Sequence, residues 1–319
     1  MTYEGIPTGT VLVGIENWPA AAESVSWAAE QAYRDGREVT LLHVMPATTL
    51  DTPPGFRAGA PSEPDQGFGA IVLSSAARYA ERRIGELSRA KELDGLRRPK
   101  VTVELRAGSP AAVLAGASSR ASLLVLGSRG RGPVGSRLLG SISRSVVEHA
   151  GCPVVVLCPG AGGVGRGVLV GVDGTSESLP ALEFAFDQAA ERHLPLTVLY
   201  CHEPDAPIQA VSHRLVVADS VAGLRDRYPD VQPRIRVQAG NPGRVLTEQA
   251  QTMHMVVIGG DGGAVARRLL GHAHSVVAIV PARTAQPGRH RRAGHFARAA
   301  RGQGVVEEQT SRWMTQPLT

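Results

Sequence analysis

The sequence predicts an α/β protein made of two tandem domains, each with a doubly wound parallel sheet flanked by helices. Two observations carry this prediction. Strand-like apolar runs alternate with helical stretches through each half of the 319-residue chain, and these runs lack the polar alternation of a strand that faces water on one side. The same order of segments also occurs twice, which indicates an internal repeat. Alternating strands and helices favour a parallel sheet covered on both faces, and the repeat predicts two such sheets.

The repeat is clearest where strands are expected. Residues 11–16 (VLVGIE) recur as residues 168–173 (VLVGVD), and helical stretches follow at residues 20–34 and 179–192. In two later segments, Ser109 or Asn241 stands where a helix N-cap is expected, with Pro at the first helical position. The other matched segments are residues 39–44 with 196–201, 101–110 with 235–242, and 123–127 with 255–259.

Composition sets the expected domain boundaries. A glycine-rich segment, residues 160–167, predicts a flexible linker, so the domains are expected at residues 1–160 and 161–286. Arginines scattered among glycines over residues 287–319 predict a basic, disordered tail. A stretch rich in Pro and Gly, residues 46–69, is either a plain long connection or part of a ligand site, because it leaves the carboxyl edge of the sheet.

The repeat weakens at the end of the second half. The first half closes with a helix at residues 141–150 and a strand at residues 153–157, whereas residues 273–280 of the second half show no clear fifth strand. The second domain is therefore expected to be degenerate at its C-terminal end. A missing strand exposes a sheet edge, which favours altered assembly.

The loop at residues 127–140 has the features of a phosphate cradle. Its five glycines leave much of the loop without Cβ atoms, so the backbone can approach a ligand closely. Arg129, Arg131 and Arg137 add positive charge, and Ser141 stands at the expected N-cap of the next helix. Free N–H groups and the peptide dipole at a helix start favour an anion such as phosphate. A tight strand-to-helix turn that needs glycine is the structural alternative.

The spacing of this loop is specific. Gly127 is followed after two residues by Gly130, and after nine more by Gly140 and Ser141. This pattern resembles the ATP-binding motif of the universal stress protein family, and the resemblance extends over roughly residues 8–280 in the tandem two-domain form. It implies two Rossmann-like (adenine nucleotide alpha hydrolase-like) domains, each with five parallel strands and four helices. It also implies that ATP, with or without Mg²⁺, lies across the carboxyl edge of the sheet.

The resemblance also implies which residues bind the nucleotide. In the family an acidic residue that ends the first strand contacts the ribose or the metal, a backbone group near the end of the second strand meets adenine, and the glycine loop holds the phosphates. No catalytic residue and no metal ligand is predicted. In this sequence the corresponding cofactor-binding residues are Gly14, Ile15, Glu16, Val44, Gly127, Ser128, Arg129, Gly130, Gly140, Ser141, Ile142 and Ser143.

The first half departs from the family pattern after its first strand. The family has Asp-Gly-Ser there, and this chain has Glu16, Asn17 and Trp18. Glutamate keeps the charge but reaches one methylene further. Trp18 either stands near the path of the nucleotide or packs on the first helix.

The second half departs at its glycine loop. Asp261 takes the position of Arg129, which places a carboxylate where phosphates would rest, and like charges repel. Eight residues instead of nine separate Gly262 from Gly271, and His272 takes the position of the small hydroxyl residue. Nucleotide is therefore expected mainly in the first domain.

Composition excludes several classes of function. No apolar run approaches the ~20 residues of a membrane helix, and no signal peptide is visible. The three cysteines have no metal or disulfide spacing, which fits the reducing cytoplasm. The net charge of +5 lies largely in the tail, where arginines lack interleaved aromatic residues, so nucleic acid is not an expected partner. The histidines form no cluster, and most of them are expected at the surface or at helix ends.

We therefore expect an ATP-binding universal stress protein that acts in stress response or dormancy, in the cytoplasm, as a homodimer joined through sheet edges. Two alternatives stay open. One is a nucleotide-free interaction and assembly module, and the other is a slow ATPase or autophosphorylating protein, for which the sequence offers no catalytic constellation.

Overall fold

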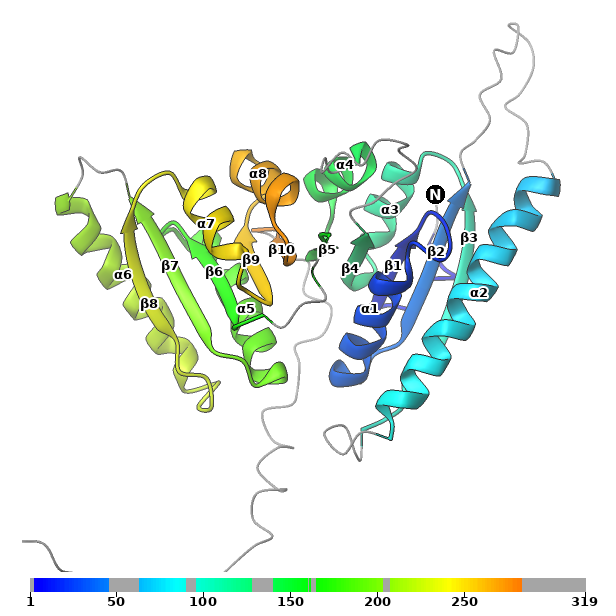
Figure 1. The fold of residues 1–319 in the computed structure, drawn as a ribbon, viewed down its shortest axis with the longest axis horizontal. Coiled ribbons are helices and arrows are strands. Elements are labelled where there is room, and N and C mark those ends of the chain that lie inside the picture. Colours follow the sequence, from blue (N-terminus) through cyan, green and yellow to red (C-terminus); the bar gives the residue numbers. More distant parts are fainter. Residues whose placement is uncertain are drawn as a thin grey trace, which may run out of the picture. The chain divides into compact units, whose positions relative to one another are not determined.

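The computed structural model describes residues 3–45, 63–89, 96–127, 140–159, 161, 165–202 and 207–282, which all belong to one compact unit. Strands and helices alternate through each half (Figure 1). The first half consists of β1 (Thr10–Ile15), α1 (Ala22–Asp35), β2 (Val39–Met45), α2 (Glu63–Leu87), β3 (Val101–Ala107), α3 (Pro110–Ser118), β4 (Ala121–Gly127), α4 (Ser141–His149) and β5 (Val154–Leu157). The second half consists of β6 (Val168–Val172), the short 3₁₀ helix η2 (Ser176–Ser178), α5 (Leu179–Arg192), β7 (Leu196–His202), α6 (Pro207–Arg225), β8 (Arg234–Ala239), α7 (Pro242–Ala250), β9 (Met255–Gly259), α8 (Ala264–His272) and β10 (Val276–Val280).

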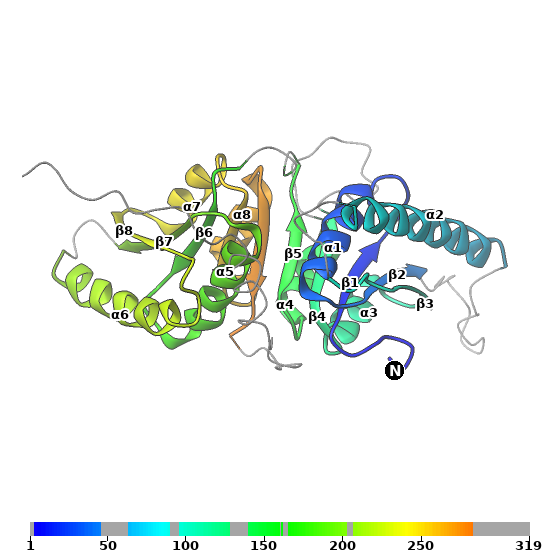
Figure 2. The ribbon, with the colours of Figure 1, turned by 90° about the horizontal axis from the view of Figure 1, so that it is seen from below.

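The strands form one ten-stranded sheet in the order β3-β2-β1-β4-β5-β10-β9-β6-β7-β8. Within each half all neighbouring strands are parallel, which confirms the predicted doubly wound α/β class. The two predicted sheets are, however, joined edge to edge into one. The halves meet where β5 and β10 pair antiparallel, with Val276 opposite Leu157 and Ile279 opposite Val154. Figure 2 shows these two strands side by side at the junction.

The expectation that the second half lacks a fifth strand is wrong, because β10 occupies that place. It pairs with β9 on one side and with β5 on the other. The error comes from the turn between β9 and α8, which consists only of residues 260–263. Because α8 therefore begins at Ala264 and ends at His272, residues 276–280 are free to form a strand, and the Gly260 N–H donates to the Val280 carbonyl at 3.0 Å.

Helices cover both faces of the sheet. Buried side chains of α1, α2, α5 and α6 share one hydrophobic cluster, to which they contribute Val25, Val72, Phe186 and Val217 respectively. Those of α3, α4, α7 and α8 share a second cluster on the other face. Successive strand residues point to opposite faces, so neighbouring residues of β1 enter different clusters. This double burial explains the continuous apolar strands of the sequence.

The stretch predicted to be irregular, residues 46–69, is helical from Glu63 onward, and residues 46–62 lie outside the described residues. Its glycines misled the prediction, because Gly69 has a packing role within α2. A Cβ atom at Gly69 would lie 2.7 Å from Leu105 Cδ1 and 3.1 Å from His43 Cδ2. Glycine thus lets α2 pack closely against β2 and β3.

The expected homodimer through sheet edges stays a prediction, but the structure changes which edges it could use. β5 and β10 pair with each other inside the chain, so β3 and β8 are the outer strands of the described sheet. Both carry charge: Glu104 and Arg106 form an ion pair of 2.9 Å on β3, and Arg234 is exposed on β8. Charged side chains oppose strand addition at an edge. Half of the expected linker (residues 160 and 162–164) and the whole region beyond residue 282 lie outside the described residues.

Candidate functional site

The candidate site lies at the carboxyl edge of the first half, where β1 and β4 are neighbours. Gly14 near the end of β1 is in register with Leu126 near the end of β4, and Ile15 with His43 of β2. The strand order reverses at this point, since the chain runs outward from β1 to β2 on one side and to β4 on the other. In such sheets ligands bind in the crevice at the reversal point.

Gly14, a predicted contact residue, has a packing role. A Cβ atom at this position would lie 2.7 Å from Leu126 Cδ2 and 3.0 Å from Leu114 Cδ2. Its counterpart in the second half, Gly171, is crowded in the same way by Leu246, at 2.9 Å. Both glycines are therefore explained by the packing of a leucine against the first strand.

Ile15 and Glu16 place a buried residue and an acidic residue at the end of β1. Ile15 is buried, and its carbonyl oxygen accepts a hydrogen bond of 2.8 Å from His43 Nδ1. Glu16 follows directly and is half-buried. The strand thus delivers a carboxylate to the carboxyl edge of the sheet.

His43 is an exception to the prediction that most histidines lie at the surface or at helix ends. This residue is buried on β2, and its ring ties β2 to the end of β1. Its position inside a run of apolar residues, 39–45, was the signal in the sequence. A polar side chain buried in a strand needs a hydrogen-bond partner, and here a backbone carbonyl supplies it.

Trp18 packs as a structural residue against α2. Its ring lies 5.2 Å from the ring of Tyr79, tilted by 58°, and it contacts the hydrophobic cluster that contains Val25 of α1. The packing role expected as one alternative is thus observed, although the aromatic partner belongs to α2 and not to the first helix.

Val44 lies one residue beyond the last pair between β1 and β2, which is Ile15 with His43. On its other side Val44 pairs with Arg106 of β3. Its side chain is buried in the cluster under α3 and α4. The main chain of Val44 therefore stands at the edge of the crevice, beside the end of β1.

Gly127 ends β4 and pairs with Leu157 of β5. A Cβ atom at Gly127 would lie 3.3 Å from the hydroxyl of Ser24, which is buried near the start of α1. This distance is tight, so glycine brings α1 close to the end of β4. The predicted contact residues Ser128, Arg129 and Gly130 lie outside the described residues.

The start of α4 completes the described part of the site. Gly140 is the N-cap residue, one position before the predicted Ser141, and as a glycine it has no side chain with which to cap the helix. The first helical hydrogen bond of α4 runs from the Arg144 N–H to the Gly140 carbonyl, at 3.2 Å. The N–H groups of Ser141, Ile142 and Ser143 precede this bond and are the ones that a helix leaves without an internal partner.

Gly140 is explained neither by its backbone nor by the described residues around it. Its φ of −59° suits any amino acid. Among the residues that the structure describes, no atom lies within 4 Å of a Cβ built at Gly140. A ligand that approaches the helix start closely would account for this glycine.

The second half has no counterpart of this loop. The four-residue turn before α8 places Gly263 at the N-cap, where the first half has Gly140. Gly262, with a φ of +88°, packs against α4, since a Cβ there would lie 3.0 Å from Glu148 Cγ. The exposed Asp261 lies in the same short turn.

The expected match of His272 with Ser141 and of Gly271 with Gly140 is therefore wrong. His272 ends α8 as His149 ends α4, and each ring nitrogen lies near the carbonyl oxygen four residues earlier, at 3.0 and 2.8 Å. Aligning the two halves by glycine spacing alone therefore matched the end of α8 with the start of α4, an offset of about one helix. The residues that the second half lacks belong to the loop between β9 and α8.

The Asp173 carboxylate, at the end of β6, is hydrogen-bonded within its own turn. Asp173 Oδ1 accepts hydrogen bonds from the Thr175 N–H at 2.9 Å and from the Thr175 hydroxyl at 2.7 Å. The main chain of η2 also lies over the end of β9, because a Cβ at Gly259 would be 3.4 Å from the Glu177 carbonyl oxygen. The second crevice is thus partly filled by the chain itself.

Other chemistry finds little support in the described part of the chain. Within it, no group of three or more His, Cys, Asp or Glu side chains is arranged to hold a metal ion. Its helices also include none with the length and apolar character to cross a membrane. The three cysteines are free; Cys152 and Cys158 are buried, and Cys201 is half-buried.

Fold and site together define a class: tandem doubly wound α/β proteins with a long strand-to-helix loop at the reversal point of one half. The universal stress protein family model matches residues 7–157 and 166–281, so this chain belongs to that family. The resemblance inferred from the glycine spacing is thereby confirmed.

Relatives support the tandem form. A universal stress protein of Mycolicibacterium smegmatis is 32% identical over 281 residues, which cover 84% of this chain and 92% of the relative. One of Mycobacterium tuberculosis is 32% identical over 289 residues, with the same coverage. Among solved structures, a universal stress protein from Archaeoglobus fulgidus has a TM-score of 0.64 at 18% identity and covers 86% of this chain and 97% of that one. The last comparison shows the fold alone.

Proposed function

We propose that this chain binds one adenine nucleotide, ATP, at the carboxyl edge of its first half and acts as a nucleotide-dependent regulator in stress response or dormancy. The observation that carries the proposal is the start of α4, which follows β4 after a long loop with glycine at both ends and whose N-cap residue, Gly140, has no side chain to cap the helix. The first three N–H groups of α4, which have no partner within the helix, and the positive end of the helix dipole suit a phosphate group. The dipole contributes only about 0.3–1 kcal/mol per charge. Hydrogen bonds from the N–H groups and the charges of the loop arginines must therefore supply the rest of the binding free energy.

Each remaining group has a role in this proposal. The half-buried carboxylate of Glu16 would meet the ribose or a Mg²⁺ ion that neutralises the phosphates, and the main chain of Val44 would meet the adenine edge. Gly14 would act indirectly, because its packing against Leu126 sets the spacing between β1 and β4. ATP, Mg²⁺ and the cytoplasmic location remain proposals.

The proposal assigns one site per chain. In the second half the strand-to-helix turn has four residues, and Asp173 is engaged by Thr175. Too few backbone N–H groups are left to surround a triphosphate, and the Asp261 carboxylate in that turn would repel it.

Titration calorimetry on the full chain tests the proposal, because the two halves offer a matched pair of variants. Gly140 and Gly263 are both N-cap residues with ordinary negative φ, and no described atom lies within 4 Å of a Cβ at either. A bulky side chain should therefore be accommodated by the fold at both positions. Gly140→Trp would fill the space of the phosphates, whereas Gly263→Trp would not.

We expect micromolar ATP affinity, on the order of −8 kcal/mol, with one site per chain. Gly140→Trp should weaken binding at least tenfold, and Gly263→Trp should leave it unchanged. Two equal sites, or equal losses in the two variants, would contradict the assignment to the first half. Protein that binds no ATP and carries no nucleotide after purification would favour the nucleotide-free interaction module instead.

A further inference from the structure

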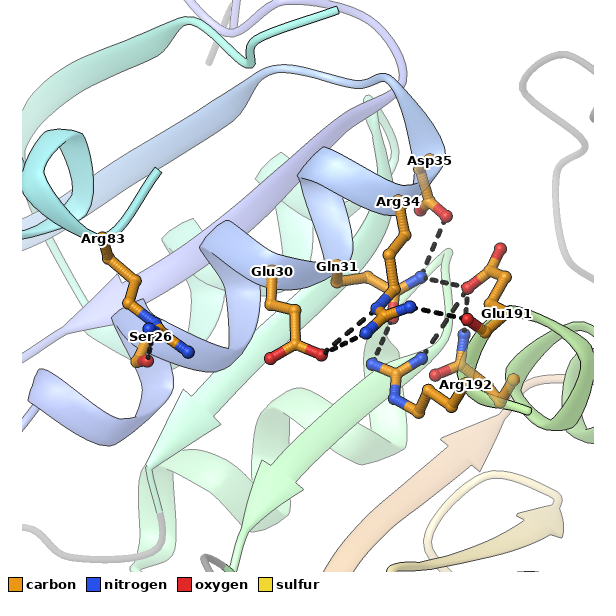
Figure 3. Close-up of polar contacts among 9 residues, drawn as sticks. Ser26, Glu30, Gln31, Arg34, Asp35, Arg83, Glu191 and Arg192 are labelled. Carbon is orange, nitrogen blue, oxygen red and sulfur yellow. Dashed lines mark hydrogen bonds and ion pairs between the residues drawn. The ribbon is translucent and has the colours of Figure 1, made fainter. Parts of the chain in front are cut away.

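A polar cluster joins α1 of the first half to α5 of the second half, and Gln31 lies at its centre (Figure 3). Gln31 Nε2 donates to Asp35 Oδ1 and to Glu191 Oε2, each at 2.9 Å. Its amide oxygen accepts from Arg192 Nη2 at 2.6 Å. Two carboxyl groups from different halves are therefore held within hydrogen-bond reach of one nitrogen atom.

This cluster is shielded from water. The side chains of Asp35 and Arg192 are 7% and 5% exposed, and that of Glu191 is 25% exposed. Two carboxylates that share such a site cannot both ionise without cost. Burial raises the pKa of Asp35, and burial together with the charge of Asp35 raises the pKa of Glu191.

We infer that Asp35 and Glu191 share one proton and form a proton-binding site between α1 and α5, whose occupancy controls how tightly the two helices are held together. With the proton bound, the Glu191 hydroxyl donates to the Asp35 carboxylate, and Gln31 bonds to both groups. When the proton leaves to water, two negative charges face each other across the junction. Glu191, the more exposed of the two, then turns toward solvent and gives up its bond to Gln31.

The other charged groups around the pair do not remove this repulsion. Arg37 Nε lies 3.8 Å from Asp35 Oδ2, and Arg192 Nη1 lies 3.7 Å from Glu191 Oε2, which are distances of ion pairs. Arg34 donates to the main-chain carbonyl of Glu191 at 2.7 Å and to the Glu30 carboxylate at 3.0 Å. Burial lowers the pKa of Arg192, and the Asp35 charge, which raises the pKa of Glu191, outweighs the Arg192 charge, which lowers it.

His254, from the turn before β9, is a further titratable group at this junction, beside the Glu30 carboxylate. Burial and the nearby arginines lower its pKa, so His254 is already neutral where the shared proton is lost. Its Nε2 atom is buried without a hydrogen-bond partner in the described structure. A pH response above neutrality therefore belongs to the carboxyl pair.

The sign of the response follows from linkage. The folded chain holds a proton that the unfolded chain releases. The stabilisation that this site contributes is therefore fully present at low pH and is lost as pH rises through the raised pKa of the carboxyl pair. One extra bound proton makes the unfolding equilibrium constant rise by up to tenfold per pH unit. The test compares full-length wild type with Glu191→Gln, in which an amide of the same shape donates permanently to Asp35.

Denaturant unfolding between pH 6 and 8.5 should show that the wild type loses stability as pH rises. The unfolding equilibrium constant of Glu191→Gln should rise less steeply, by a factor of up to ten per pH unit. Glu248→Gln is the matched control, since Glu248 is exposed and pairs with Arg244 on the surface. It should keep the wild-type slope. Equal slopes in wild type and Glu191→Gln would overturn the proposal.

Infrared spectroscopy gives a second readout that a merely structural role would not move. Wild-type protein in D₂O near neutral pH should show the band of a protonated carboxyl group, which disappears at high pH and is absent in Glu191→Gln. The same band should persist in Glu248→Gln. A wild-type spectrum without a protonated carboxyl band would mean that both groups are ionised and would refute the shared proton.

Discussion

His43 Nδ1 donates a hydrogen bond to the Ile15 carbonyl oxygen at 2.8 Å and so ties the second strand to the end of the first. Truncation in His43→Ala removes this bond and leaves a buried carbonyl unpaired beside a cavity. We expect the free energy of unfolding to fall by about 2–4 kcal/mol in denaturant titrations. ATP affinity should fall as well, because Glu16 follows Ile15 directly.

Two further variants separate the hydrogen bond from general effects. His43→Asn keeps a donor near the Nδ1 position and should recover part of the loss. His149→Ala removes a histidine that also lies near a main-chain carbonyl, at 2.8 Å, but is exposed. It should change stability by no more than about 0.5 kcal/mol, and a larger loss there would show that the assay does not report on burial.

Gly14 should tolerate no side chain. In Gly14→Ala the new methyl group would meet Leu126 and Leu114 at 2.7 and 3.0 Å, and overpacking of this kind costs about 1–3 kcal/mol. Gly223→Ala is the control, because Gly223 is exposed in α6 and a Cβ there meets nothing within 4 Å among the described residues. That substitution should raise stability by about 0.5 kcal/mol. Thermal unfolding of both variants checks the pair.

Trp18 should contribute to stability and not to nucleotide affinity. Its ring packs on Tyr79 at 5.2 Å, so Trp18→Ala should cost about 2 kcal/mol of unfolding free energy through lost burial and the lost aromatic pair. ATP affinity measured by calorimetry should stay within about threefold. An affinity that improves tenfold or more would mean that the indole obstructs the nucleotide in solution.

The cysteines should differ in reactivity. Burial raises the pKa of Cys152 and of Cys158 to about 12, so neither forms a thiolate near neutral pH, and both are inaccessible. Cys201 is half-buried and therefore partly accessible, although burial raises its pKa too. A disulfide reagent at pH 8 should label Cys201 alone in the native chain and all three cysteines after unfolding. Native Cys201→Ser should then show no labelling.

The fold could be predicted because its information is local and repeated. The helix expected at residues 179–192 is α5, and each apolar run between helices became a strand of a sheet covered on both faces. Two local errors share one cause. Glycines were taken as markers of loops or of motif positions, whereas Gly69 permits close packing of a helix and Gly271 lies inside α8.

The site could be predicted only in outline. Residues at the carboxyl ends of β1 and β4 follow from strand order, and the helix start follows from the position of Gly140. The role of His43 and the partner of Trp18 depend on contacts between elements. The pairing of Gln31 with Glu191 joins residues 160 positions apart, and no pattern in the sequence links them.

The antiparallel pair β5–β10 has a consequence for any attempt to express the lobes separately. All four residues of β5, Val154–Leu157, are buried and apolar, and β10 supplies their outer neighbour. In a fragment that stopped at Pro159, this short valine-rich strand would form an exposed sheet edge with unpaired main-chain groups along one side. Exposed edges of this kind pair with other chains, so the isolated first half should aggregate or dimerise. In the intact chain β10 covers the edge of β5 and prevents this.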